Sequence, residues 1–370
     1  MLDPTIFAVP LLGAGALFVL SILSSNDLVI DTIQVPTSLS DRGYSSVVIG
    51  RMLTDELRNL NAAANRELSG VRVYGTNLDA SLYDLSQYFG FSGITSDIRN
   101  IAVGIPYFVR AEIVDDDGTF NFDARIFRSR SAQVDVVRAT FKPGTKQETL
   151  DPIDGAAIRP LIHEAAVAIL GTVNPYIVAV HLAQTELDAQ KWQFPQTRDF
   201  LDRMLTNPDP YDDHLAYELL GRLQYWRAEG DSSLNTEQVT TALEEASRLL
   251  RKSLVKAPDF FFANLSLARV QALLGNVQVA DQYFARAVAE EPNDLQARIA
   301  WGKALAKQQR IRDAIFQYVA AVEINGNDAN VRRALSELYA KAGRPDAARV
   351  EAEAAYHLDP NDGIETRFMQ

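Results

Sequence analysis

FFANLSLARVQALLGNVQVADQYFARAVAEEPND, residues 261–294, is followed directly by LQARIAWGKALAKQQRIRDAIFQYVAAVEINGND, residues 295–328. The two segments align without gaps, and a third copy begins at residue 329. Alanine returns every 34 residues, at Ala280, Ala314 and Ala348. A repeat of this length predicts stacked helix–turn–helix units, in which each unit buries its apolar face against its neighbours.

Small residues mark the places where the two helices of each unit are expected to cross. With each unit numbered from its first residue, position 8 is Ala268, Gly302 or Ser336, and position 20 is always alanine. The pattern resembles the tetratricopeptide repeat, which implies an α–α superhelix that binds proteins. Two residues of the middle unit depart from it, Gln309 in place of the turn glycine and Gly326 in place of the final proline.

The array is predicted to extend beyond these copies. Regular units cover residues 261–294, 295–328 and 329–360 of an array spanning 212–360. The first unit contains an insertion of about 13 residues near Gly230, and a degenerate two-helix repeat is expected before it at 174–211. Repeat arrays commonly end in a polar capping helix. The tail, 361–370, is too short to form one, so the carboxy-terminal end is a candidate contact face.

The amino terminus predicts a single transmembrane helix over residues 5–25. No charged residue occurs from Pro4 to Asn26, and IFAVPLLGAGALFVLSIL, residues 6–23, is almost wholly apolar. About 20 such residues suffice to span a bilayer core. A cleaved signal peptide and a buried soluble helix are the alternatives. The run lacks a preceding basic region and a small-residue cleavage site before Ser24, which argues against a signal peptide.

Residues 28–172 predict a compact α+β domain. Apolar residues alternate with polar ones from Tyr107 to Ile113 and again from Phe120 to Ile126, with Asp117-Gly118 between the two runs. Alternation around an Asp-Gly pair predicts a β-hairpin. A third strand at 133–141 would complete an antiparallel meander. The remaining expected elements are strands at 28–35 and 71–74 and helices at 45–64, 82–89 and 154–170.

Three segments of this region carry a second resemblance. They are Ile33-Gln-Val-Pro36, Leu53-Thr-Asp-Glu-Leu57 and the acidic hairpin that begins at Tyr107. Together they resemble the amino-terminal domain of the Tol system protein TolB, which is similar to the flagellar protein FlgO. The resemblance covers about 28–172 and departs from the usual pattern between Gly70 and Pro106. It implies a protein-interaction module next to a repeat array, and it carries no catalytic residue to this chain.

Composition and spacing give no catalytic, cofactor-binding or metal-ligating residue. The net charge of −12 argues against nucleic acid as the partner, which requires clustered cations, and the absence of cysteine excludes thiolate chemistry. The acidic stretch from Asp115 to Asp123 is a hairpin tip, because its glycine is misplaced for a calcium loop. The four histidines are isolated in sequence and lack metal-ligand spacing: His163, His181, His214 and His357.

The candidate partner-binding groove lies on the first helices of the array. In this repeat type, positions 5, 9, 12 and 13 of the first helix face the concave surface. Five cations occupy such positions in an otherwise acidic chain: Arg269, Lys303, Lys307, Arg333 and Lys341. Alanine at 272, 306 and 340 leaves room for a bound segment. A basic groove predicts an acidic peptide or terminal carboxylate as ligand, while scattered solvated charges remain the alternative.

These observations predict a scaffold without enzymatic activity, held at a bacterial inner membrane with its main body in the periplasm. Its partners would be other proteins, chiefly subunits of a membrane complex, and homo-oligomerisation is left open. Two alternatives remain. The chain could be a permanent structural subunit of a large membrane complex, or a regulatory subunit whose α+β domain senses a ligand.

Overall fold

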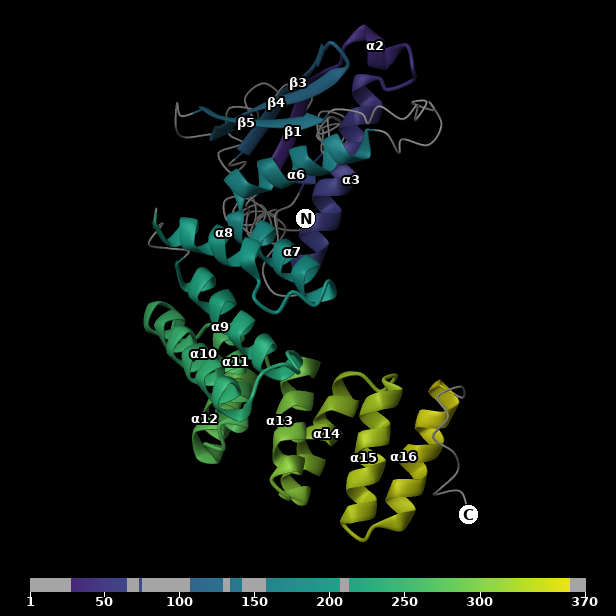
Figure 1. Cartoon of the computed structure of the whole chain (residues 1–370). Coiled ribbons are helices and arrows are strands. Elements are labelled where there is room, and N and C mark those ends of the chain that lie inside the picture. Colours follow the sequence, from purple (N-terminus) through teal and green to yellow (C-terminus); the bar gives the residue numbers. More distant parts are fainter. Residues whose placement is uncertain are drawn as a thin grey trace, which may run out of the picture. The chain divides into compact units, whose positions relative to one another are not determined.

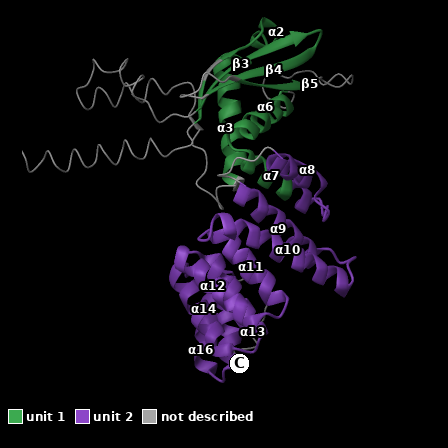
Figure 2. Ribbon diagram, turned by 90° about the vertical axis from the view of Figure 1, so that its left-hand side faces the viewer, with its two compact units in different colours: residues 1–184 green, residues 185–370 purple. Residues whose placement is uncertain are grey.

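The computed structural model describes residues 28–64, 73–74, 107–128, 134–141, 158–206 and 213–359. The chain forms two compact units, residues 1–184 and 185–370 (Figure 2). The expected anchor at 5–25, the short helix at 82–89 and the tail at 361–370 lie outside the described residues. Within the described ranges, no helix combines the length and apolar character needed to cross a bilayer.

The first unit is built on a five-stranded sheet with the order β2-β1-β3-β4-β5. The predicted hairpin is confirmed, since β3 and β4 pair antiparallel with Asp116 opposite Thr119. The β1 strand instead runs parallel to both of its neighbours, which the sequence did not predict. The strands are β1 (Leu28–Gln34), β2 (Val73–Tyr74), β3 (Tyr107–Asp116), β4 (Thr119–Arg128) and β5 (Val134–Phe141).

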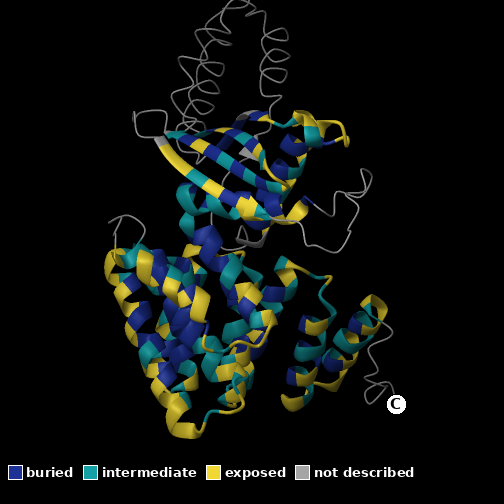
Figure 3. Cartoon of the chain, turned by 45° about the horizontal axis from the view of Figure 1, so that its top comes forward, coloured by how far each residue is buried: buried dark blue, intermediate teal, exposed yellow. Residues whose placement is uncertain are grey.

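Helices α3 (Ser46–Ala64) and α6 (Arg159–Val173) cover one face of this sheet (Figure 1). A short helix, α2 (Thr37–Ser40), precedes α3. Apolar residues of α3 recur at intervals of three and four, and Ile49, Leu53 and Leu57 are fully buried. The inward-facing residues of the strands, such as Phe122 and Ile126, are buried as well. Figure 3 shows this alternation as dark blue buried positions along the strands.

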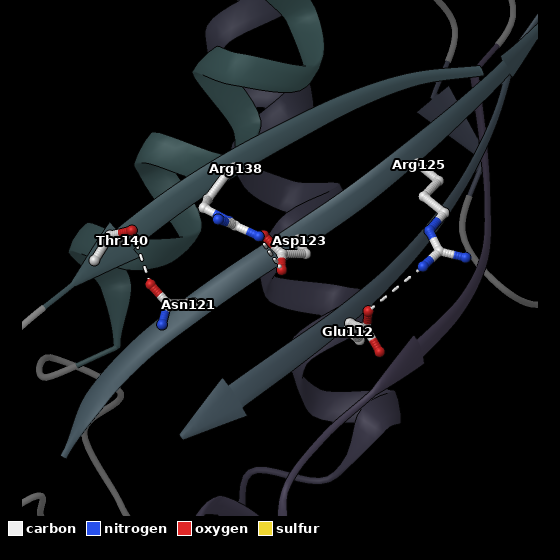
Figure 4. A network of polar contacts seen from close by, with 6 residues as sticks. All are labelled: Glu112, Asn121, Asp123, Arg125, Arg138 and Thr140. Carbon is white, nitrogen blue, oxygen red and sulfur yellow. Dashed lines mark hydrogen bonds and ion pairs between the residues drawn. The ribbon is translucent and has the colours of Figure 1, made fainter. Parts of the chain in front are cut away.

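The opposite face of the sheet carries polar side chains paired across the strands (Figure 4). Arg138 on β5 donates hydrogen bonds of 2.5 and 3.0 Å to Asp123 on β4. Thr140 donates to Asn121 over 2.9 Å, two residues further along the same two strands. These pairs lie directly opposite one another, so the open face is held by side chains that satisfy each other.

The second unit is a series of antiparallel helices joined by short turns. Helix α7, which precedes this series, lies mostly in the first unit and ends in the second, and α9 and α10 are longer than the helices that follow. The helices are α7 (Pro175–Asp188), α8 (Pro195–Thr206), α9 (Asp213–Gly230), α10 (Thr236–Lys256), α11 (Phe261–Leu273), α12 (Val277–Glu290), α13 (Leu295–Lys307), α14 (Ile311–Ile324), α15 (Ala329–Lys341) and α16 (Pro345–Leu358).

The small residues lie where the helices cross, as predicted. A Cβ atom added to Gly302 on α13 would lie 2.7 Å from the ring of Tyr318 on α14. In the next unit, the Ser336 hydroxyl donates to the carbonyl of Ala348 over 2.7 Å, which joins positions 8 and 20 directly. The alanines at 280, 314 and 348 are at most 1% exposed. Larger side chains at these positions would separate the two helices.

Candidate functional site

The repeats of the array pack on one another in chain order, so their first helices follow one another along one side of it. Helix α13 contacts α11 of the preceding repeat, and α15 packs against α14 of the preceding repeat. Apolar residues contribute to both junctions: Ala300 and Trp301 of α13 pack on the core of the preceding repeat, and Val331 of α15 does the same. Equivalent positions of stacked repeats therefore lie on the same side of the array.

Three of the five predicted groove cations are exposed on this surface. Lys303 and Lys307 of α13 are one helical turn apart, so both side chains lie on the same face of the helix. Lys341 of α15 is exposed and occupies the same position in its repeat as Lys307. The structure therefore offers three solvated lysines on two neighbouring first helices.

The two arginines of the predicted set are partly buried. Arg333 donates to Asn330 over 2.8 Å and forms an ion pair of 3.5 Å with Asp359, and only 18% of its side chain is exposed. Arg269 is only partly exposed on α11. Burial, followed by a hydrogen bond with Glu229, raises the pKa of Tyr225 on α9, and the nearby charge of Arg269 opposes this rise. The Arg333 guanidinium is therefore already occupied by contacts with Asn330 and Asp359 of its own chain.

Helix α9 carries a buried ion pair at positions 5 and 9 of its repeat, where later repeats have Arg333 at position 5 and Arg269 and Lys303 at position 9. Arg222 Nε lies 3.5 Å from Glu218 Oε1, with 7% and 0% of the two side chains exposed. The hydroxyl of Ser266 on α11 donates to the same carboxylate over 3.3 Å, and the Arg222 guanidinium lies over the ring of Trp226. Sequence reasoning missed this pair, although its positions, 5 and 9, were the ones assigned to the groove. The exposed groove cations thus lie on α13 and α15.

A polar clamp joins the first two regular repeats. Asp281 of α12 accepts a hydrogen bond of 2.9 Å from Trp301 Nε1 on α13 and pairs with Arg310 at the start of α14. The Trp301 ring also stacks on Phe284, with 9° between the ring planes. One carboxylate therefore contacts both helices of the following repeat.

Two of the four histidines, expected to be isolated, lie together in the first unit. The rings of His163 and His181 are 5.4 Å apart, and His163 Nδ1 is 2.7 Å from a carboxylate oxygen of Glu56. Burial lowers the pKa of His181, and the charge of His163 lowers it further. The charge of Glu56 raises it to a lesser extent. Among the described residues, no group of three or more histidine, aspartate or glutamate side chains is placed to hold a metal ion.

Tandem helix pairs with small crossing residues define the second unit as a tetratricopeptide-like helical repeat. The first unit is a small sheet packed against helices.

No family model and no curated protein matches the chain. Among solved structures, MamA residues 41 to end from Desulfovibrio magneticus RS-1 is similar at 15% identity and a TM-score of 0.40, covering 51% of this chain and 98% of that one. YrrB, described as a TPR protein with an unusual peptide-binding site, is similar at 20% identity and a TM-score of 0.38, covering 53% and 94%. These similarities are too low to carry an argument, so the repeat fold rests on the helix pairs of the chain itself.

Proposed function

We propose that this protein is an interaction scaffold whose helical array holds a partner protein at a bacterial inner membrane. The observation that carries the proposal is the run of exposed lysines on the first helices of neighbouring repeats, Lys303, Lys307 and Lys341. The chain has a net charge of −12, so a local group of cations on it favours an acidic segment over a random contact.

The membrane side of the proposal rests on sequence. The uncharged apolar run at 5–25 would anchor the chain, and the α+β domain that resembles the TolB amino-terminal module would lie next to the bilayer. The main body would then be periplasmic. An active periplasmic reporter fused after Gln370 supports this orientation, whereas activity only from a cytoplasmic reporter contradicts it.

The groove is tested by charge reversal at the three lysines together. Lys303, Lys307 and Lys341 are replaced by Glu, and partners are identified by cross-linking in the native membrane followed by mass spectrometry. Since all three side chains are exposed, the fold should be retained, and circular dichroism checks this. We expect partner cross-links to fall at least tenfold.

The matched control reverses three exposed arginines on the second helices of the three regular repeats, Arg286, Arg312 and Arg349. It makes the same change in net charge on a different surface, and partner cross-links should be retained. Equal cross-linking by both triple variants would refute the groove. Recovery in mild detergent only as part of a fixed assembly would instead favour a permanent structural subunit.

A further inference from the structure

A pocket of about 460 Å³ lies among helices α8, α9 and α10, away from the lysines of the groove. Its lining includes two arginines, Arg198 of α8 and Arg227 of α9, together with Gln224 of α9. Thr241, Glu237 and Glu245 contribute from α10. The volume is within the range of pockets that bind small ligands or peptide side chains.

The pocket arises from the unusual length of two helices. Helices α9 and α10 have 18 and 21 residues, compared with 13 and 14 in the repeat that follows. The extra turns include Arg227 and Glu237, near the insertion that the sequence places after Gly230. A Cβ atom on Gly230 would lie 2.2 Å from the Trp192 ring, so this glycine allows the segment before α8 to approach the end of α9.

The start of α8, where Arg198 lies, is fixed by a buried carboxylate. Glu186 is 1% exposed and accepts hydrogen bonds from the backbone N–H groups of Gln196 and Thr197, over 2.9 and 3.1 Å. The Thr197 hydroxyl donates to it as well, over 2.7 Å. Arg198 is the next residue, so its backbone position at the pocket is set before any ligand arrives.

The two arginines of the pocket lie near carboxylates without forming an ion pair with a described residue. Arg198 is exposed, and its charge adds to the effect of Arg248 in lowering the pKa of Glu245. The charge of Arg227 adds to the effect of Ser233 in lowering the pKa of Asp231, and Arg227 Nε is buried without a hydrogen-bond partner among the described residues. Gln224, which is 7% exposed, lines the same pocket. A buried polar group without a partner costs stability, so a ligand that supplies one gains affinity.

The two glutamates of the pocket differ in their contacts, since one is paired with an arginine and the other is exposed. Glu245 already pairs with Arg248, whose guanidinium Nε donates to it over 2.7 Å. That hydrogen bond is the main cause of the lowered pKa of Glu245, so this carboxylate is ionised and occupied. Glu237 is exposed in the first turn of α10. Its charge disfavours anions that carry two or more negative charges at one centre.

We propose that the pocket between α8, α9 and α10 binds a carboxylate, held by the guanidinium groups of Arg198 and Arg227 with the Gln224 amide as a third donor. Planar guanidinium groups match a carboxylate in geometry and charge. The carboxylate belongs either to an acidic side chain of a bound peptide or to a free small molecule. The site lies on helices other than those of the lysine groove, so the two proposals can be tested separately.

The test uses the full-length protein in detergent micelles and three probes: a fluorescein-labelled peptide with alternating glutamate and leucine, succinate, and inorganic phosphate. Binding of the peptide is followed by anisotropy, and the other two act as competitors. Arg198→Glu and Gln224→Leu should each weaken binding of the carboxylate probe at least tenfold. Arg203→Glu is the matched control, because Arg203 lies on the same helix and pairs only with the exposed Asp199 among described residues.

Each outcome decides the proposal. Peptide binding that succinate does not displace assigns the site to a protein partner, while displacement of the peptide by succinate assigns it to small carboxylates as well. No binding of the peptide overturns the proposal. Equal affinity for the peptide and for its glutamine counterpart overturns the proposal, as does phosphate competing as well as succinate. It is also overturned if reversal of Lys303, Lys307 and Lys341 abolishes binding while Arg198→Glu does not.

Discussion

The turn between the two helices of each regular repeat has the same backbone conformation, although its central residue is glycine in two repeats and glutamine in the third. Gly275 and Gly343 have φ values of 79° and 69°, and Gln309 has 61°. The hydrogen bonds are the same in the three turns, since the residue after each of these donates to a carbonyl five positions back, over 2.9 to 3.0 Å. Replacing Gln309 by Gly should therefore preserve the turn and remove its strain.

The magnitude follows from two opposing effects. A side chain in the left-handed region costs about 1–2 kcal/mol. Glycine loses more backbone freedom on folding, which costs about 0.5–1 kcal/mol. We therefore expect Gln309→Gly to raise the free energy of unfolding by about 0.5–1 kcal/mol. The reverse change, Gly343→Gln, should lower it by a similar amount, because no atom lies within 4 Å of an added Cβ at Gly343 and only the backbone conformation is affected.

Urea denaturation monitored by tryptophan fluorescence measures both changes, since Trp301 stacks on Phe284 within the same array. The slope of the free energy against urea should stay constant, which shows that stability and not compactness has changed. A decrease in stability for Gln309→Gly, together with no change for Gly343→Gln, would refute the strain argument.

Three further changes test other parts of the structure. Gly302→Ala should lower the free energy of unfolding by about 1–3 kcal/mol, since the added Cβ would lie 2.7 Å from the Tyr318 ring. This loss outweighs the better helix propensity of alanine. Unchanged urea denaturation would contradict the close helix crossing. Glu186→Ala should cost about 1–3 kcal/mol and increase hydrogen exchange at the start of α8, and unaltered exchange there would argue against the capping role. The pKa of His181 in the folded protein is lowered by burial and by the charge of His163. Below about pH 6.5 the unfolded chain therefore binds more protons than the folded chain. The stabilising contribution is present above that pH and is lost as the pH falls toward the folded pKa. His181→Gln should flatten this loss in thermal denaturation between about pH 5 and 8, and an identical pH profile would exclude His181 as its source.

Local signals in the sequence predicted most of the fold. The Asp117-Gly118 pair determined the hairpin, and the structure places both residues at positive φ. The period of 34 residues located the helix crossings, because packing at a crossing depends on a single small side chain. The parallel pairing of β1 with β3 was not predictable in this way. It joins Leu28 to Tyr107, and no turn residue marks a pairing between segments so far apart.

The candidate sites were less accessible to sequence reasoning. Periodicity placed Lys303 and Lys341 on first helices, where they are exposed. It could not show that Arg333 contacts Asp359, since that contact depends on the end of a different helix. The α8–α10 pocket draws its residues from three helices and has no spacing of its own in the sequence. Its only sequence signal was the insertion after Gly230, which indicated an irregular unit without indicating a cavity.

The polar clamp at Asp281 implies that the two junctions between the regular repeats differ in mechanical stiffness. The residues of the next junction that correspond to Asp281 and Trp301 are Ile315 and Leu335, which are apolar and 9% and 1% exposed. Hydrogen bonds are directional, whereas apolar contacts tolerate small rotations. Rotation of one repeat on the next should therefore be more restricted at the Asp281 junction than between α14 and α15, where the contact is extensive and apolar. Because Lys307 and Lys341 lie on either side of the α14–α15 junction, small rotations there would change the spacing between their charges.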